Sequence, residues 1–218
     1  MTEGSRITME GEKKQFRKSR MTRKKIVNQA YEFFLSVGFA ETTVAMISKA
    51  VGVSYGTVYT YFNSKSDIFI EIIEDTVQEL YSMARTPFFP KTAKEAYFII
   101  CEQAFSHQSF AVKNKRILEI IEEAMHLSPE VRLKWQHIQD YFLGTIAQDI
   151  RYSQNAGLLR EGVIPEITAR KWYATNEWFL WEIAKNPERY DIAQLSRIIS
   201  REYVVGIYNV KGYDELIP

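Results

Sequence analysis

Apolar residues recur at intervals of three and four along most of this chain, which is the spacing of helices that bury one face. The first such run has its apolar positions at Ile26, Ala30, Phe33, Phe34 and Val37. It stops at Gly38, a residue type that can end a helix with a positive φ. Residues 1–20 are polar and show no sustained apolar period, so we expect a flexible arm there and order from about Thr22.

Two short helices are predicted next, with a three-residue break between them. The pair Thr42-Thr43 offers hydroxyls for an N-cap, and the helix that follows has its apolar positions at Val44, Ile47 and Val51. Gly52 then permits a positive φ, and Ser54 can cap a further helix over residues 55–62. Two short helices joined by a tight turn that contains glycine are typical of a helix-turn-helix, whose second helix enters the major groove of DNA.

The helix predicted over residues 55–62 has one face for the core and one for DNA. Val58 and Phe62 are four residues apart and are expected to face inward. The opposite face carries Tyr55, Gly56, Tyr59 and Thr60. The missing side chain of Gly56 lets a DNA backbone approach closely. The hydroxyls of Tyr59, Thr60 and Tyr61 can reach phosphates or bases.

The rest of the chain is also predicted to be helical, so the fold class is all-α. Ser64 and Asp67 form a capping-box-like start to a fourth helix that runs to about Arg85. Lys65 in its first turn is expected to bind a phosphate together with the free N–H groups of the helix terminus. Further helices are expected near 92–108, 112–126, 129–155, 165–186 and 191–210, with Pro or Gly at several of the breaks. We divide the chain into the arm (1–20), the helix-turn-helix domain (21–66) and a larger helical domain (67–218).

The net charge of +1 conceals an uneven distribution of charge along the chain. Residues 1–65 hold eleven Lys and Arg against five Asp and Glu, whereas the remainder holds seventeen against twenty-two. A basic segment ahead of an acidic body is typical of a protein that binds a polyanion through one small module. The single cysteine, Cys101, excludes an internal disulfide, and no apolar run approaches the roughly 18 residues of a membrane helix. We therefore expect a cytoplasmic protein with no cofactor, no metal and no membrane contact.

The segment from Gly38 to Lys65 resembles the DNA-binding domain of the tetracycline-repressor (TetR) family. The resemblance lies in Gly38-Phe39, in TTV at 42–44 and in the run ISKAVGVSYGTVYTYFNSK at 47–65. It implies that the DNA-contacting positions are Thr43, Gly56, Tyr59, Tyr61 and Lys65. Many members have Lys or Arg where this chain has Tyr55, so Tyr55 is a departure from the family pattern that we keep as a candidate contact. The resemblance also implies a homodimer on a palindromic double-stranded DNA operator, and most relatives are repressors.

The same resemblance implies that the larger domain binds an inducer and dimerises. An apolar or aromatic small molecule is expected, with lining candidates Phe98, Phe105, Trp135, Phe142 and Trp178. The last two long helices are expected to form the dimer interface. Their apolar candidates are Trp178, Phe179, Trp181, Ile198, Ile199, Tyr203 and Val204.

Two other classes of protein compete with this interpretation. The motif Glu122-Glu123-x-x-His126 has the Glu-x-x-His spacing of helical di-iron enzymes, but such sites need a second copy, which the sequence lacks. A helical adaptor that binds only other proteins is the third class. It leaves unexplained why the positive charge gathers around a helix-turn-helix. DNA affinity that falls steeply with salt would distinguish the regulator from the adaptor.

Overall fold

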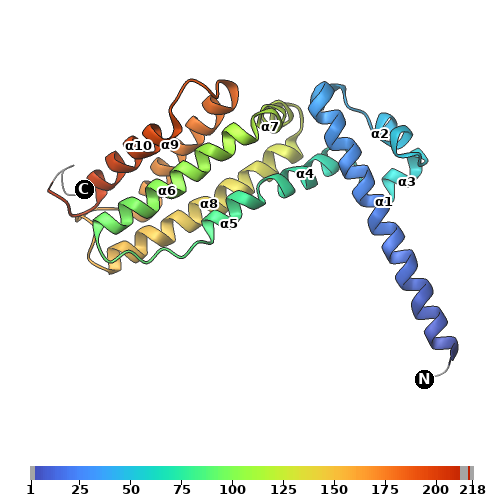
Figure 1. Ribbon diagram of the computed structural model, residues 1–218, viewed down its shortest axis with the longest axis horizontal. Helices are drawn as coiled ribbons and strands as arrows, with labels where there is room; N and C mark the ends of the chain where they lie inside the picture. Colours follow the sequence, from blue (N-terminus) through green and yellow to red (C-terminus); the bar gives the residue numbers. More distant parts are fainter. Residues whose placement is uncertain (1–2, 212–215, 217–218) are drawn as a thin grey trace. The chain divides into compact units, whose positions relative to one another are not determined.

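The computed structural model describes residues 3–211 and 216, with side chains from residue 15 onward, and its architecture is all-α as predicted (Figure 1). The chain folds into two compact units. Unit 1 comprises residues 1–76 and 123–132, and unit 2 comprises residues 77–122 and 133–218. The domain boundary predicted at 66/67 lies ten residues before Thr76, where the first segment of unit 1 ends.

Unit 1 contains four helices and a compact aromatic core. The helices are α1 (Glu3–Glu41), α2 (Val44–Val51), α3 (Tyr55–Tyr59) and α4 (Lys65–Thr76). Helix α1 packs on α2 and α4, and α2 packs on α3. The rings of Phe34, Phe39 and Phe69 lie within 4.7 to 5.7 Å of one another by their centroids and are almost fully buried. Each such side chain contributes about 1.5–3 kcal/mol by leaving water, so this cluster holds the short helices in place.

Residues 3–20 form the beginning of α1, in the segment for which the sequence predicts a flexible arm (1–20). The helix starts at Glu3, although the side chains of residues 15–18 are exposed and bury no apolar face. Residues 12–20 contain no Gly or Pro and are rich in Lys, Arg, Glu and Gln, which have high intrinsic helix propensity. A helix can therefore continue there without tertiary packing, which a search for apolar periodicity does not detect.

Two helix ends also differ from the prediction. The helix expected over 55–62 is helical only to Tyr59, and residues 60 and 61 form a turn. The single helix expected from Lys65 to about Arg85 is interrupted at Val77, where φ is −82° and ψ is 1°. Val77 is buried and is neither Gly nor Pro, so no local signal in the sequence marks this break. The interruption separates α4 in unit 1 from α5 (Gln78–Ala84) in unit 2.

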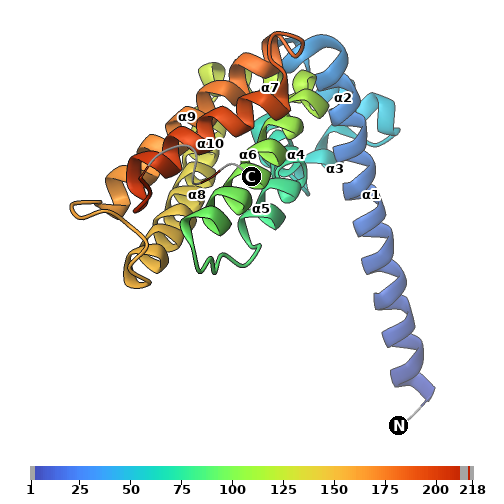
Figure 2. The same cartoon turned by 60° about the vertical axis from the view of Figure 1, so that its left-hand side comes forward.

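Unit 2 is a bundle of long helices arranged around α6 (Ala93–Lys113). Helix α6 packs on α5, on α9 (Pro165–Lys185) and on α10 (Ile192–Ile207), as both views show (Figure 1, Figure 2). The other two helices, α7 (Lys115–Leu127) and α8 (Pro129–Asn155), contribute residues to both units. Helices α6 to α10 agree with the five predicted ranges to within five residues at each end. No helix of the described part of the chain is long and apolar enough to cross a membrane.

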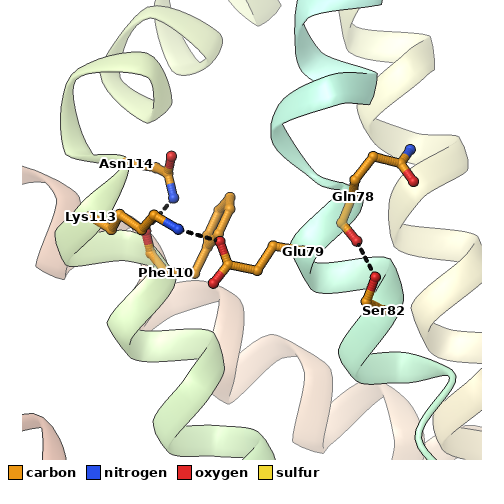
Figure 3. A network of polar contacts seen from close by, with 6 residues as sticks. All are labelled: Gln78, Glu79, Ser82, Phe110, Lys113 and Asn114. Atoms are coloured by element: carbon orange, nitrogen blue, oxygen red, sulfur yellow. Dashed lines mark hydrogen bonds and ion pairs between the residues drawn. The ribbon is translucent and has the colours of Figure 1, made fainter.

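A small polar network joins the start of α5 to the end of α6 (Figure 3). Lys113 Nζ lies 2.8 Å from a carboxylate oxygen of Glu79. Beside it, the Asn114 side chain donates to the Phe110 carbonyl at 3.0 Å and so satisfies one group at the end of α6. The ion pair is exposed and adds at most about 1 kcal/mol. The network lies at one end of α5, and α5 forms one wall of a pocket described below.

Candidate nucleic-acid interface and ligand pocket

The turn between α2 and α3 is built by local capping, as the sequence predicts. The Thr43 hydroxyl accepts a hydrogen bond from the Met46 amide at 3.2 Å and opens α2. Gly52 closes α2 in the left-handed conformation, with φ 73° and ψ 35°. The Ser54 hydroxyl then accepts from the Thr57 amide at 3.1 Å and opens α3. These three residues set the direction in which α3 leaves the turn.

Helix α3 has one buried face and one exposed face, which confirms the predicted orientation. Val58 is 1% exposed and Phe62 just beyond the helix is 4% exposed, whereas Tyr55 and Tyr59 are 52% and 43% exposed. The hydroxyls of Tyr55 and Tyr59 lie 3.1 Å apart and their rings are in contact. This hydrogen bond raises the pKa of Tyr59, so the phenol stays neutral at physiological pH. The exposed face therefore offers two paired hydroxyls to a partner.

Gly56 lies between these two tyrosines, and nothing in the protein requires a glycine there. Its φ is negative, and a Cβ added to it would meet only the Ser54 Oγ, at 4.0 Å. A glycine in a helix costs roughly 0.5–1 kcal/mol relative to alanine. The described part of the fold therefore does not use the missing side chain, and the α3 backbone at Gly56 is open to close approach from outside.

The other residues predicted to contact DNA near α3 differ in their exposure and in the hydrogen bonds that their hydroxyl groups already make. Thr43 and Thr60 are exposed, but the Thr43 hydroxyl caps α2 and the Thr60 hydroxyl donates to the Thr57 carbonyl at 2.7 Å. Thr43 keeps its O–H donor and one acceptor lone pair, whereas Thr60 has used its O–H and keeps two acceptor lone pairs. Tyr61 is only partly exposed. Tyr55, Gly56, Tyr59 and Thr60 are thus exposed together on α3 and the turn that follows it. Thr43 lies at the start of α2, the preceding helix.

Lys65 does not extend freely toward solvent, as a simple phosphate ligand would. It begins α4, as predicted, but its ammonium donates to the carbonyls of Phe39 and Ala40 at 2.6 and 3.1 Å. The ammonium also lies 4.4 Å from the centre of the Phe39 ring, and burial lowers the pKa of Lys65. To bind a phosphate, Lys65 would have to leave or share these carbonyls.

The same turn is held from its other side by Glu123, which the sequence analysis had considered only as a metal ligand. Its carboxylate accepts hydrogen bonds from the amides of Phe39 and Ala40, at 3.2 and 2.9 Å. The turn follows Gly38, where φ is 86° and ψ is 176°, a combination that is essentially restricted to glycine. Lys65 and Glu123 therefore satisfy the carbonyls and the amides of one turn, and we call this pair the Gly38 brace.

The Gly38 brace gives the Glu-x-x-His motif a structural role. Glu123 is committed to backbone amides, and the described residues contain no group of three His, Cys, Asp or Glu side chains that could hold a metal ion. Charged hydrogen bonds across 80 residues of sequence cannot be recognised from local spacing, which is why the sequence analysis missed this role.

Helix α1 adds positive charge to unit 1. Arg17, Lys18, Arg20, Lys24 and Lys25 are exposed along it. Arg23 is different, because its guanidinium pairs with Glu71 and lies 4.7 Å from the centre of the Phe62 ring. Arg23 thus helps to fix the position of Phe62, which lies just beyond α3, while Arg17, Lys18, Arg20, Lys24 and Lys25 remain exposed.

Comparison with known proteins identifies this arrangement. Residues 26–72 match the family model of bacterial regulatory proteins, tetR family. The chain is 25% identical over 187 residues to the fatty acid metabolism regulator protein of Bacillus subtilis, which covers 84% of this chain and 94% of that protein. The chain belongs to the TetR family of transcriptional regulators.

Solved structures share the fold of this chain over most of its length. The complex of SmeT with triclosan superposes with a TM-score of 0.68 at 24% identity, covering 88% of this chain and 94% of that one. NalD of Pseudomonas aeruginosa, described as the secondary repressor of a multidrug efflux pump, gives a TM-score of 0.68 at 22% identity, covering 88% and 98%. Members of the family are transcription factors, which decides against the alternative of a metal enzyme.

Unit 2 of this TetR regulator contains a pocket of about 90 Å³ between α5, α6, α8 and α9, which is partly open to solvent. Of the five predicted lining residues, only Phe142 lies there. Trp135 is buried elsewhere, in contact with Trp181, and its indole N–H donates to Glu177. Phe98, Phe105 and Trp178 are 49%, 44% and 54% exposed on the surface. Helical periodicity does not tell an inward aromatic residue from an outward one when both faces of a helix carry them.

The lining of this pocket is mostly apolar, with a few polar side chains. Its apolar residues are Leu80, Met83, Ala84, Ala104, Phe142, Ile146 and Trp172. Its polar residues are Gln103, His107, Thr145, Asp149, Tyr173 and Asn176. Burial raises the pKa of Asp149 to about 7 and lowers that of His107 to about 4. Apolar walls with a few converging polar groups are typical of a small-molecule site.

Proposed function

We propose that this regulator binds a palindromic DNA operator as a homodimer, represses transcription there, and is released when an apolar or aromatic small molecule enters the unit 2 pocket. The observation that carries the proposal is the face of α3. This face exposes Tyr55, Gly56 and Tyr59 while Val58 anchors the helix in the core.

DNA binding follows from the chemistry of that face and its surroundings. Tyrosine and threonine hydroxyls donate to phosphates and base edges, and a glycine lets the helix backbone approach the groove. The exposed Lys and Arg side chains on α1 add attraction to the phosphates. We infer that α3 enters the major groove and that Thr43 at the start of α2 contacts the DNA backbone.

The dimer interface is proposed on the outer surfaces of α9 and α10. Trp178 and Ile167 on α9 are 54% and 56% exposed, and Ile198 on α10 is 37% exposed. Large apolar side chains gathered on a surface are typical of a protein contact. Two of the residues predicted for the interface do not contribute, because Ile199 and Val204 are buried within their own chain at 7% and 0% exposure. Phe179, Trp181 and Tyr203 are partly buried.

Release by a ligand requires that the pocket be coupled to unit 1. Helix α7 directly follows α6, which lines the pocket, and α7 has residues in both units. Residues 115–122 of this helix belong to unit 2, whereas Glu123 belongs to unit 1 and is part of the Gly38 brace. We propose that an occupied pocket favours a position of α7 in which Glu123 no longer holds the Phe39 and Ala40 amides. A ligand can shift this equilibrium only by its difference in affinity for the two states. The names of the relatives, one a regulator of fatty acid metabolism and one a complex with triclosan, support an apolar ligand.

Selection of duplexes from a random pool by the full-length chain tests the proposal. We expect an enriched inverted repeat with half-sites about 34–36 Å apart, or a multiple of that spacing, bound by two chains. Sedimentation of the free protein at micromolar concentration should show a dimer. A pool that remains random, or a protein that stays monomeric, would contradict the proposal and favour the adaptor.

A further inference from the structure

The unit 2 pocket holds an acidic side chain that no described residue neutralises. Asp149 on α8 lines the pocket, and the structure gives it neither an ion pair nor a hydrogen bond in the described part of the chain. No Lys or Arg is among the lining residues. Burying a carboxylate without a partner is costly, so this acid lowers the stability of the empty protein.

A second polar group in the pocket is also without a partner. The Nδ1 atom of His107 on α6 is fully shielded from water and has no hydrogen bond among the described residues. Burial keeps the imidazole neutral, since its pKa falls to about 4. The other titratable groups near Asp149 are Tyr173 in the pocket and Tyr203 and Tyr208 on the α10 side, all neutral phenols whose pKa values are raised. Among the described residues, the pocket lining contains no Lys or Arg to supply positive charge to Asp149.

Aromatic rings complete the surroundings of the acid. Phe142, Trp172 and Tyr173 line the same pocket, and aromatic faces attract cations that have left water. A carboxylate ligand would instead meet Asp149 with no cation to compensate, a repulsion that a low-dielectric pocket strengthens. The pocket therefore discriminates by the charge of the ligand as well as by its shape.

We propose that the inducer is an amphiphilic amine, whose apolar body fills the pocket and whose ammonium group pairs with Asp149. This inference rests on the proposed ligand-binding role of unit 2 and names its ligand class. A fatty acid with a free carboxylate is disfavoured, although a relative regulates fatty acid metabolism.

Three probes with one common chain test the proposal: decylamine, decanol and decanoate. Calorimetric titration of the full-length protein below the micelle concentration of each probe should give the tightest binding for decylamine. We expect Asp149→Asn to weaken decylamine binding by about tenfold or more and to leave decanol nearly unchanged. The control Asp140→Asn removes an exposed acid from the same helix and should change none of the three affinities.

Proton release gives a second readout that a structural role of Asp149 would not produce. With a pKa of about 7, Asp149 is about half protonated at pH 7, so pairing with an ammonium should release about half a proton. Titrations in buffers of different ionisation enthalpy measure this number. Decanoate binding as tightly as decylamine, no binding of decylamine, or an unchanged affinity in Asp149→Asn would overturn the proposal. Operator binding by the free protein is measured separately, so the ligand assignment can fail while the DNA-binding function stands.

Discussion

Replacing Gly56 by alanine should strengthen the fold and weaken DNA binding at the same time. The added Cβ meets only Ser54 Oγ at 4.0 Å, which is ordinary van der Waals contact, and the φ of Gly56 already suits an L-residue. The change from Gly to Ala in a helix therefore stabilises unit 1 by about 0.5–1 kcal/mol. On DNA the same methyl group occupies the space into which the groove must fit. We expect the operator affinity to fall by about tenfold, or about 1.4 kcal/mol.

The stability readout must report on unit 1, because all four tryptophans of the chain lie in unit 2. Hydrogen exchange of the α2 and α3 amides serves this purpose, and fluorescence anisotropy with a labelled operator measures affinity. The control is Gly144→Ala, at an exposed helical position in α8 where an added Cβ has no neighbour within 4 Å. It should leave operator binding unchanged. If Gly56→Ala binds the operator as tightly as the wild type, close approach of DNA to α3 is refuted.

Three further variants test the Gly38 brace and the pocket. Glu123→Ala leaves the Phe39 and Ala40 amides without acceptors, so their hydrogen exchange should accelerate and unit 1 should lose about 1–3 kcal/mol, whereas the exposed control Glu119→Ala should have no such effect. Lys65→Met should cost a similar amount by freeing the two carbonyls, and equal stability in that variant would contradict the brace. Folding raises the pKa of Asp149 from 3.8 to about 7, so the charged side chain destabilises the folded protein increasingly between about pH 4 and pH 7. Asp149→Asn removes this effect. Its melting temperature should exceed that of the wild type above pH 7 and converge with it near pH 4. A difference that is constant with pH would refute the burial of this acid.

Local chemistry accounts for the parts of the fold and of the interface that the sequence predicts well. The caps at Thr43 and Ser54 and the left-handed Gly52 each act within four residues, so their signals are complete in a short segment. The same holds for the buried pair Val58 and Phe62, which is set by the period of one helix. These features are enough to position the exposed face of α3.

Features that depend on residues far apart in the sequence could not be predicted from local sequence patterns. Glu123 reaches a turn more than 80 residues away, and the ammonium of Lys65 turns inward because the Phe39 and Ala40 carbonyls happen to lie beside it. The pocket shows the same limit. Asp149 carries no motif, and its character comes from burial among residues of four helices. Long-range polar pairing and burial are properties of packing, and neither has a period along the chain.

The most direct test of the central claim is an anisotropy titration of the selected operator with the wild type and with a Tyr55→Ala/Tyr59→Ala double variant, between about 50 and 200 mM salt. Both side chains are exposed, so the variant should fold normally, and Tyr190→Phe in unit 2 serves as the control. We predict affinity that falls steeply with salt for the wild type and the control, and a loss of about tenfold or more for the double variant at every salt concentration. Equal affinity of the double variant, or wild-type binding that does not change with salt, would contradict the assignment of α3 as the surface that reads DNA.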